Sequence, residues 1–351
     1  MRWQHKLTQA WLHKGALARV LWPVSCVFAG LVKLRQSLYA LGWLKSHRLP
    51  VPVIVVGNVM AGGVGKTPIV MALANDLRTQ GWRVGVVSRG YGRRTNDVRE
   101  VLPNSNPSDV GDEPLLIAQK CNIPVFVAPR RLQAAQALLD AHDDIQIILC
   151  DDGLQHMALQ RDIELCVFDE RGIGNGWLLP AGPLREPWPR RALTQSGANS
   201  EHPVLRLEIF TAANAPNLAL KVTRHLSTHA FRADGQTVAL SQLAERKTQA
   251  LAGIGKPEAF FAMLRQAGLT LQHTQALADH AAMDKVQIDP ALGEVVCTEK
   301  DALKLWSQYP LAWAVPLEID IPQQLLEDLQ NHLESLHNLC PLSSRTWTPN
   351  Y

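Results

Sequence analysis

A glycine-rich segment near the start of the chain constrains the fold more than any other feature. It reads Met60-Ala-Gly-Gly-Val-Gly-Lys-Thr67, follows the apolar run Val53–Val56 and precedes a helix-like stretch over Ile69–Thr79. A strand, a glycine-rich turn that ends in Lys-Thr, and a helix together form the phosphate-binding loop of P-loop proteins. The sequence therefore predicts a nucleotide-binding domain of this type.

The residue types of this segment suit the binding of phosphates. Its glycines allow backbone N–H groups to approach an anion without clashes from Cβ atoms. Lys66 can reach the β- and γ-phosphates, and the Thr67 hydroxyl can ligate Mg²⁺. Met60 departs from the pattern Gly-x-x-x-x-Gly-Lys-Thr, which has glycine at that position. The residues expected to bind the nucleotide are Ala61, Gly62, Gly63, Val64, Gly65, Lys66, Thr67 and Pro68.

Apolar runs of strand length alternate with helical stretches from residue 51 onward. The strand candidates are Val53–Val56, Arg83–Val87, Val125–Ala128, Ile145–Cys150 and Glu164–Phe168, and the helix candidates are Ile69–Thr79, Pro114–Lys120 and Arg131–Ala141. Nearly continuous apolar strands joined by helices indicate an α/β fold, with a mostly parallel sheet and helices on both faces. Ligands of such sheets bind at the carboxyl ends of the strands.

The chain is expected to divide into three parts. Residues 1–48 form a basic amphipathic segment, 49–200 the P-loop domain, and 201–351 a second, smaller α/β domain that contributes to the active-site cleft. The boundary near residue 200 rests on the Pro- and Arg-rich stretch Pro180–Arg191 and the polar stretch Gln195–His202. Ala250–Ala252, Val295–Cys297 and Trp313–Leu317 are strand candidates of the second domain, and Pro257 is expected to open a helix that ends near Ala267.

A second glycine-rich segment, Gly253–Pro257, superficially resembles a P-loop. It lacks a hydroxyl residue after Lys256, so it is interpreted as a turn that starts a helix. The six cysteines are scattered without a Cys-x-x-Cys pair. They are interpreted as reduced thiols of a cytosolic protein, with neither a zinc site nor a disulfide framework.

The amino-terminal part of the chain is basic. No Asp or Glu precedes Asp76, whereas nine Lys or Arg residues lie before it. The whole chain has 35 basic and 32 acidic residues, so the remainder is net acidic. This asymmetry indicates that the amino-terminal part binds an anionic partner, either membrane lipid or nucleic acid.

The apolar residues of the same part favour the membrane. Trp3, Leu7, Ala10 and Trp11 recur at helical spacing, and Val20–Val32 is almost wholly apolar. Pro23 interrupts that run, which is shorter than the roughly 20 residues that span a bilayer. A basic amphipathic segment in the plane of an anionic leaflet is the preferred interpretation. A helical hairpin on the protein's own core is the alternative, and no recognised nucleic-acid-binding module is present.

Several polar motifs follow predicted strands. Asp151 and Asp152 follow Ile145–Cys150, where P-loop enzymes place a carboxylate that holds Mg²⁺. Two adjacent carboxylates repel each other, and a shared cation would offset that repulsion. Arg89 lies in a glycine-rich turn that could bind an anion. In Gly111-Asp-Glu-Pro114, the local sequence favours Asp112 as a helix N-cap and Glu113 as a first-turn acid.

The motifs taken in order resemble the tetraacyldisaccharide 4′-kinase family of lipid A biosynthesis. The segments that carry the resemblance are Val53–Asn58, Gly62–Pro68, Val87–Gly92, Gly111–Pro114, Asp151–His156, Asp169–Arg171, Asn175-Gly176, Leu179–Glu186, Asp279-His280 and Thr298–Asp301. They extend over roughly residues 10 to 320. That family also lacks glycine at the position of Met60. Ala281 stands where the family usually has a second histidine.

The resemblance implies an inner-membrane enzyme, on the cytoplasmic face, that transfers the γ-phosphate of ATP to the 4′-hydroxyl of a tetraacyldisaccharide 1-phosphate. It implies Asp112 as the catalytic base, His280 as its assistant and Lys66 as a catalytic cation. Mg²⁺ would bind Thr67 and one or both of Asp151 and Asp152. The side chains expected near the glycolipid are Asn58, Arg89, Glu170 and Arg171. No nucleic acid and no obligate protein partner are expected.

A second hypothesis is a membrane-associated P-loop switch of the partitioning-ATPase type. Those proteins generally carry a lysine ahead of the Gly-Gly pair, and Ala61 occupies that position here. The sequence therefore favours the kinase.

Overall fold

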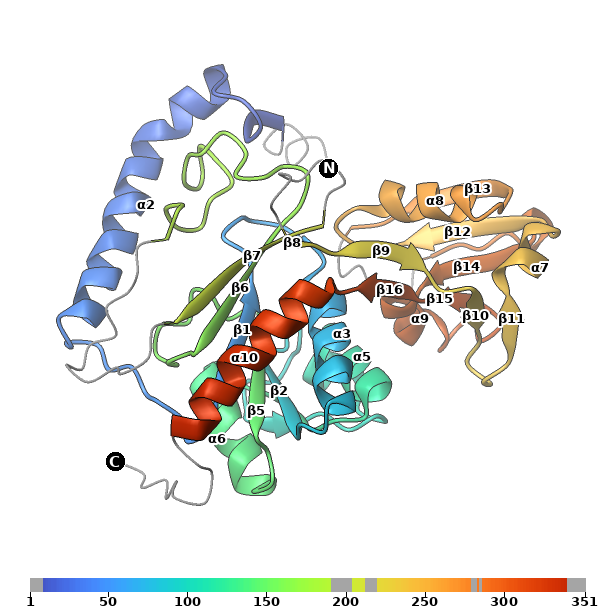
Figure 1. The fold of residues 1–351 in the computed structure, drawn as a ribbon. Coiled ribbons are helices and arrows are strands. Elements are labelled where there is room, and N and C mark those ends of the chain that lie inside the picture. Colours follow the sequence, from blue (N-terminus) through green and yellow to red (C-terminus); the bar gives the residue numbers. More distant parts are fainter. Residues whose placement is uncertain (1–8, 191–203, 212–219, 279–282, 284–285, 340–351) are drawn as a thin grey trace.

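The computed structural model describes residues 9–190, 204–211, 220–278, 283 and 286–339. Within them the chain forms two α/β units that a two-stranded ribbon joins, with one long helix along the side of the larger unit (Figure 1). This arrangement confirms the predicted fold class.

The larger unit contains an eight-stranded sheet in the described residues, in the order β3-β4-β2-β5-β1-β6-β7-β8. Its strands are β1 (Val53–Gly57), β2 (Val84–Ser88), β3 (Arg99–Glu100), β4 (Val125–Val127), β5 (Ile147–Asp151), β6 (Ile163–Phe168), β7 (Leu205–Phe210) and β8 (Leu220–Lys221). Its helices are α3 (Lys66–Thr79), α4 (Pro107–Val110), α5 (Asp112–Cys121) and α6 (Arg131–Ala141). All neighbouring strands are parallel except β3 and β4.

The alternation of side chains along β1 explains the helices on both faces. Ile54 and Val56 point into a core that α3 and α5 cover. Val53 and Val55 point into a second core, which α6 covers. All five residues of β1 are buried, as expected for a central strand of a parallel sheet.

The larger unit extends past residue 200, where the sequence placed a boundary. β7 pairs with β6 from Ile163 to Phe168, and β8 follows at the edge. Helix α10 (Gln323–Leu339) returns from the end of the chain and packs Leu325, Leu329 and Leu333 on the core that holds α3. Strand pairing and helix packing therefore both cross the expected division.

The smaller unit contains a six-stranded sheet in the described residues, in the order β11-β10-β15-β14-β12-β13. Its elements are β10 (His229–Phe231), β11 (Thr237–Ala239), α7 (Leu240–Ala244), β12 (Thr248–Ala252), α8 (Pro257–Gln266), β13 (Leu271–Ala276), a 3₁₀ turn (Pro290–Leu292), β14 (Glu294–Thr298), α9 (Glu299–Leu305) and β15 (Trp313–Val315). The predicted strands at Ala250–Ala252 and Val295–Cys297 and the helix from Pro257 are confirmed.

An antiparallel ribbon joins the two units. It consists of β9 (Thr223–Leu226) and β16 (Leu317–Asp320). The sequence predicted one strand over Trp313–Leu317, and this was wrong because Pro316 separates two strands that belong to different sheets. Ile319 of β16 packs on the core that holds α3, so the ribbon lies against the P-loop helix.

Helix α2 (Ala16–Ala40) runs along the side of the larger unit, next to the loop that follows β6 (Figure 1). Most of its side chains are exposed, including Val20, Val24, Val27 and Leu31. The sequence predicted an apolar run too short to span a bilayer, but the helix continues through Pro23 for 25 residues. It is the one helix among the described residues that is long and apolar enough to cross a membrane by length and composition.

Candidate active site

The P-loop lies between β1 and α3, and two of its glycines have backbone angles that other residues rarely adopt. Gly62 has φ +103° and Gly65, the N-cap of α3, has φ +79°. Met60 does not have a positive φ angle, and its side chain is buried in the core beneath the loop. Glycine is therefore required at 62 and 65 but not at 60.

Asn58 stabilises the P-loop from below. Its side-chain amide donates to the carbonyl oxygen of Gly62 at 3.2 Å, and Gln155 donates to the carbonyl oxygen of Asn58 at 3.1 Å. Asn58 is fully buried. The structure thus places this predicted substrate residue inside the loop, where it fixes the turn.

Arg224 of β9 contacts the P-loop from the ribbon. Its Nη2 donates to the carbonyl oxygen of Val64, and its guanidinium lies where a Cβ on Gly65 would be, at 2.6 and 2.9 Å. Burial lowers the pKa of Arg224, and the nearby carboxylates of Asp169 and Glu170 partly oppose this shift. No local pattern marked this residue, since it lies far along the chain from the loop that it contacts.

Gly65→Ala is therefore expected to weaken nucleotide binding by more than tenfold. An alanine at this backbone angle costs about 1–2 kcal/mol, and the Arg224 guanidinium would have to leave its position. Gly81→Ala is the matched control, because Gly81 has φ +92° at the far end of α3 and nothing within 4 Å of a Cβ. The check is titration with a fluorescent ATP analogue. Equal affinities of the two variants would contradict the prediction.

Lys66 and the two aspartates after β5 form the centre of the site. Lys66 Nζ lies 3.4 Å from Asp152 Oδ1. Arg185, from the loop after β6, also contacts Asp152, with Nη1 at 3.3 Å from Oδ2. Burial would raise the pKa of Asp152, but Lys66, Arg185 and Arg131 hold it below its ordinary value.

Asp151 lies in a different environment from its neighbour. It is 2% exposed, and its Oδ1 has no hydrogen-bond partner among the described residues. Burial and the nearby Glu113 carboxylate raise the pKa of Asp151 to about 7, while Lys66 opposes this shift. A buried carboxylate oxygen without a partner is costly and suits an incoming cation.

Asp112 is the first residue of α5, and its carboxylate is buried. The predicted N-cap role was wrong, because Gly111, with φ +93°, is the N-cap. Lys304 of α9 reaches Asp112, with Nζ 2.5 Å from Oδ2. Lys300 of the same helix lies 3.2 Å from Glu113, which is a first-turn acid as predicted. Two lysines of the smaller unit thus pair with the two acids at the start of α5.

The remaining predicted residues lie on other loops at this edge of the sheet. Arg89 is exposed, and the following Gly90 packs on the turn that starts α5. Arg171 binds Asp169 and lies near Gly62. Glu170 pairs with Lys256.

Lys256 shows that the second glycine-rich segment does more than start a helix. It is the N-cap of α8, as the predicted turn requires, and its Nζ lies 2.8 Å from Asp169. Gly255 lies close to Gly63 of the P-loop. The second glycine-rich turn therefore faces the first across the two units. His280 lies outside the described residues.

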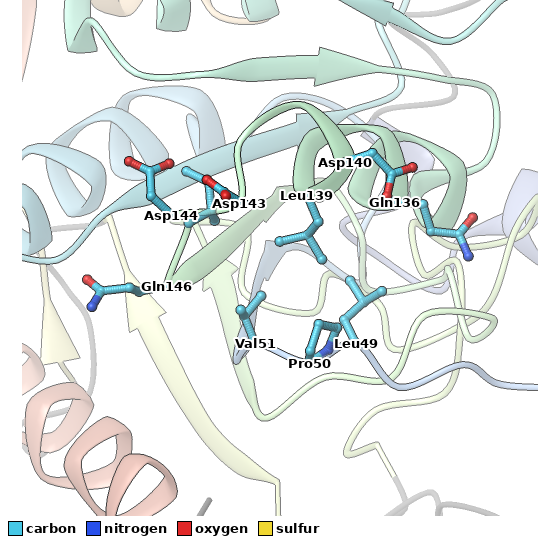
Figure 2. Close-up of a pocket in the computed structure, with 10 residues that line it drawn as sticks. Leu49, Pro50, Val51, Gln136, Leu139, Asp140, Asp143, Asp144 and Gln146 are labelled. Atoms are coloured by element: carbon cyan, nitrogen blue, oxygen red, sulfur yellow. The ribbon is translucent and has the colours of Figure 1, made fainter. Parts of the chain in front are cut away.

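A cavity of about 430 Å³ lies at the opposite edge of the sheet (Figure 2). Leu49–Val51, before β1, and Ile145-Gln146, before β5, line it together with residues of α6 and its following loop. It lies at the amino ends of the strands, whereas the P-loop and the aspartates lie at the carboxyl ends. The cavity is therefore separate from the candidate site.

Comparisons with known proteins give a consistent result. The family model described as tetraacyldisaccharide-1-P 4′-kinase matches residues 17–334. A tetraacyldisaccharide 4′-kinase of Acidovorax sp. (strain JS42) is 52% identical over 332 residues, covering 94% of this chain and 95% of the relative. The enzyme of that name from Polaromonas naphthalenivorans (strain CJ2) is 50% identical, covering 96% and 97% of the two chains.

A solved structure is similar as well. The crystal structure of LpxK from Aquifex aeolicus in complex with ATP has a TM-score of 0.74 and 27% sequence identity. The match covers 91% of this chain and 99% of that one.

Proposed function

The chain belongs to the tetraacyldisaccharide-1-phosphate 4′-kinase family, and from this premise we propose how its described residues act in ATP-dependent phosphorylation of the 4′-hydroxyl. The chain is a kinase of lipid A biosynthesis, and this assignment replaces the partitioning-ATPase hypothesis. The observation that carries the proposed mechanism is electrostatic. Glu113, next to Asp112, and Lys66 of the P-loop both act on the buried Asp151. The start of α5 and the P-loop therefore both lie close enough to Asp151 to influence its charge.

Asp112 is proposed as the base. A sugar hydroxyl is a weak acid, and an oriented carboxylate can accept its proton while the oxygen attacks the γ-phosphorus. The bond from the γ-phosphorus to the bridging oxygen breaks, and ADP leaves. The ion pair with Lys304 holds the Asp112 carboxylate in position before the acceptor arrives. Lys66 would move away from Asp152, and its ammonium group would then neutralise the phosphate oxygens.

Thr67, Asp151 and Asp152 fit Mg²⁺ by their chemistry. All three offer hard oxygen atoms, and Asp151 keeps a buried oxygen without a hydrogen-bond partner in the described part of the chain. No group of three His, Cys, Asp or Glu gathers as a metal cage in that part. Mg²⁺ commonly binds one or two carboxylates together with substrate phosphates, which suits this set. When bound, it would neutralise charge on the transferring phosphoryl group.

Helix α2 is proposed to hold the enzyme on the cytoplasmic face of the inner membrane. Val20, Val24, Val27 and Leu31 expose between 56% and 74% of their surface, and Lys33 and Arg35 lie on the same helix. A four-chain glycolipid leaves a bilayer reluctantly, because each buried CH₂ contributes about 0.8 kcal/mol. The enzyme would therefore meet its acceptor at the lipid surface, where basic residues favour anionic lipids.

The proposed function is tested by direct assay. The protein is incubated with labelled ATP, Mg²⁺ and detergent-dispersed tetraacyldisaccharide 1-phosphate, and labelled bisphosphorylated lipid is expected. A disaccharide acceptor that already carries a 4′-phosphate is the control and should remain unlabelled. Label in water-soluble phosphate alone, at the same rate with or without acceptor, would contradict the assignment.

A further inference from the structure

Arg185 contacts a carboxylate that also binds the P-loop lysine. The Nη1 atom of Arg185 lies 3.4 Å from Oδ1 and 3.3 Å from Oδ2 of Asp152, and Lys66 Nζ lies 3.4 Å from the same Oδ1. One carboxylate is therefore shared by two cations, one from the P-loop and one from the loop after β6. The sequence placed Arg185 in a motif but gave it no function.

The backbone around Arg185 fixes this contact. The Arg185 N–H donates to the carbonyl oxygen of Val59 at 2.7 Å, and the Ala61 N–H donates to the carbonyl oxygen of Pro183 at 2.8 Å. Met60 and Leu184 are paired between these two bonds. The segment that leads into the P-loop and the segment that carries Arg185 therefore form one short antiparallel pair, which places the guanidinium beside Asp152.

Sharing the carboxylate has an energetic consequence for Lys66. To bind phosphates, Lys66 must leave Asp152. A partly buried carboxylate without a cation is unfavourable, and Asp152 exposes only 33% of its side chain. With Arg185 present, Asp152 keeps one cation when Lys66 departs. Without Arg185, the departure of Lys66 would leave the carboxylate with no ion-pair partner among the described residues. Only the nearby charge of Arg131, which binds the Asp152 carbonyl oxygen, would remain.

We propose that Arg185 is a positioning residue that holds Asp152 and so frees Lys66 to bind the nucleotide phosphates. This inference rests on the proposed role of Lys66 in nucleotide binding. Arg185 acts through Asp152 and contacts neither substrate. Its effect should therefore depend on the carboxylate at position 152.

A double-mutant cycle tests this dependence. The affinity for a fluorescent ATP analogue is measured in EDTA. Metal binding by Asp152 then makes no contribution to the measured affinity. Arg185→Met is expected to weaken binding about tenfold in the native background and less than threefold in an Asp152→Asn background. Arg185→Lys should retain most of the affinity. Arg246→Met removes a comparable ion pair, with Glu294 at 2.7 Å in the smaller unit, and should change nothing.

The outcomes separate this inference from the proposed function. An equal loss from Arg185→Met in both backgrounds would mean that Arg185 contacts the nucleotide or maintains the loop, and would overturn the inference alone. Lys66→Met should weaken binding strongly. If it leaves the affinity unchanged, the proposed role of Lys66 and the inference both fail.

Discussion

Asp112→Asn is expected to lower the rate of phosphoryl transfer by about 10²–10⁴-fold, the usual range for loss of a positioned base. The amide has nearly the same shape as the carboxylate but cannot accept the proton of the 4′-hydroxyl. Affinity for ATP should change little, because the P-loop and Lys66 are untouched. The measurements are initial rates with the lipid acceptor and a separate titration with a nucleotide analogue.

Asp109→Asn is the matched control for this variant. Asp109 precedes Asp112 by three residues, lies on the short helix α4, and exposes 41% of its side chain. The Asp109→Asn variant makes the same change of charge next to the same turn. Its rate of phosphoryl transfer should stay within about twofold of that of the native enzyme, as is usual for exposed substitutions. Normal turnover of the Asp112 variant would show that another group is the base.

The combined variant Val27→Glu/Leu31→Glu is expected to abolish binding to anionic vesicles. These side chains are 65% and 60% exposed and lie four residues apart, on one face of α2. Burying each in lipid is worth about 1.5–3 kcal/mol, so losing both should weaken binding at least a hundredfold. The glutamates would add repulsion from the anionic leaflet. Sedimentation with vesicles measures the effect.

Val98→Glu/Leu102→Glu is the control for the vesicle experiment. Both residues are exposed, at 41% and 51%, and they are likewise four positions apart in the sequence. The control removes two apolar side chains and adds two charges, but on the segment around β3 rather than on α2. It should sediment with vesicles like the native protein. If the α2 variant does so as well, the proposed membrane contact is wrong.

The strands of the larger unit could be predicted because their sequence signals are local. Val53–Val56 is an uninterrupted apolar run, and Glu164–Phe168 is apolar after its first residue. The structure extends each strand by one residue. Helix α6 has the predicted bounds Arg131–Ala141. The P-loop was equally local, since its glycines and Lys66 are contiguous in the chain.

Features that depend on distant segments could not be predicted in this way. β7 joins the first sheet through pairing with β6, and α10 returns to that sheet from the end of the chain. Nothing in the sequence of either segment specifies its partner. The same applies to the site, where Arg224 reaches Val64 from the ribbon and Lys304 reaches Asp112 from the smaller unit. The N-cap prediction for Asp112 failed because a turn at Gly111 and the distant Lys304 together decide the position of that carboxylate.

Ser25 joins the long helix to the loop that carries Arg185. Its hydroxyl donates to the carbonyl oxygen of Leu178 at 2.9 Å and accepts from the N–H of Ala181 at 2.8 Å. The helix cannot slide along its axis or rotate about it without breaking both bonds. In the proposed membrane-bound orientation, these two hydrogen bonds, together with the packing of Trp22 on Trp177, would therefore set the height of the catalytic groups above the lipid headgroups, and hence how far an acceptor sugar must protrude to be phosphorylated.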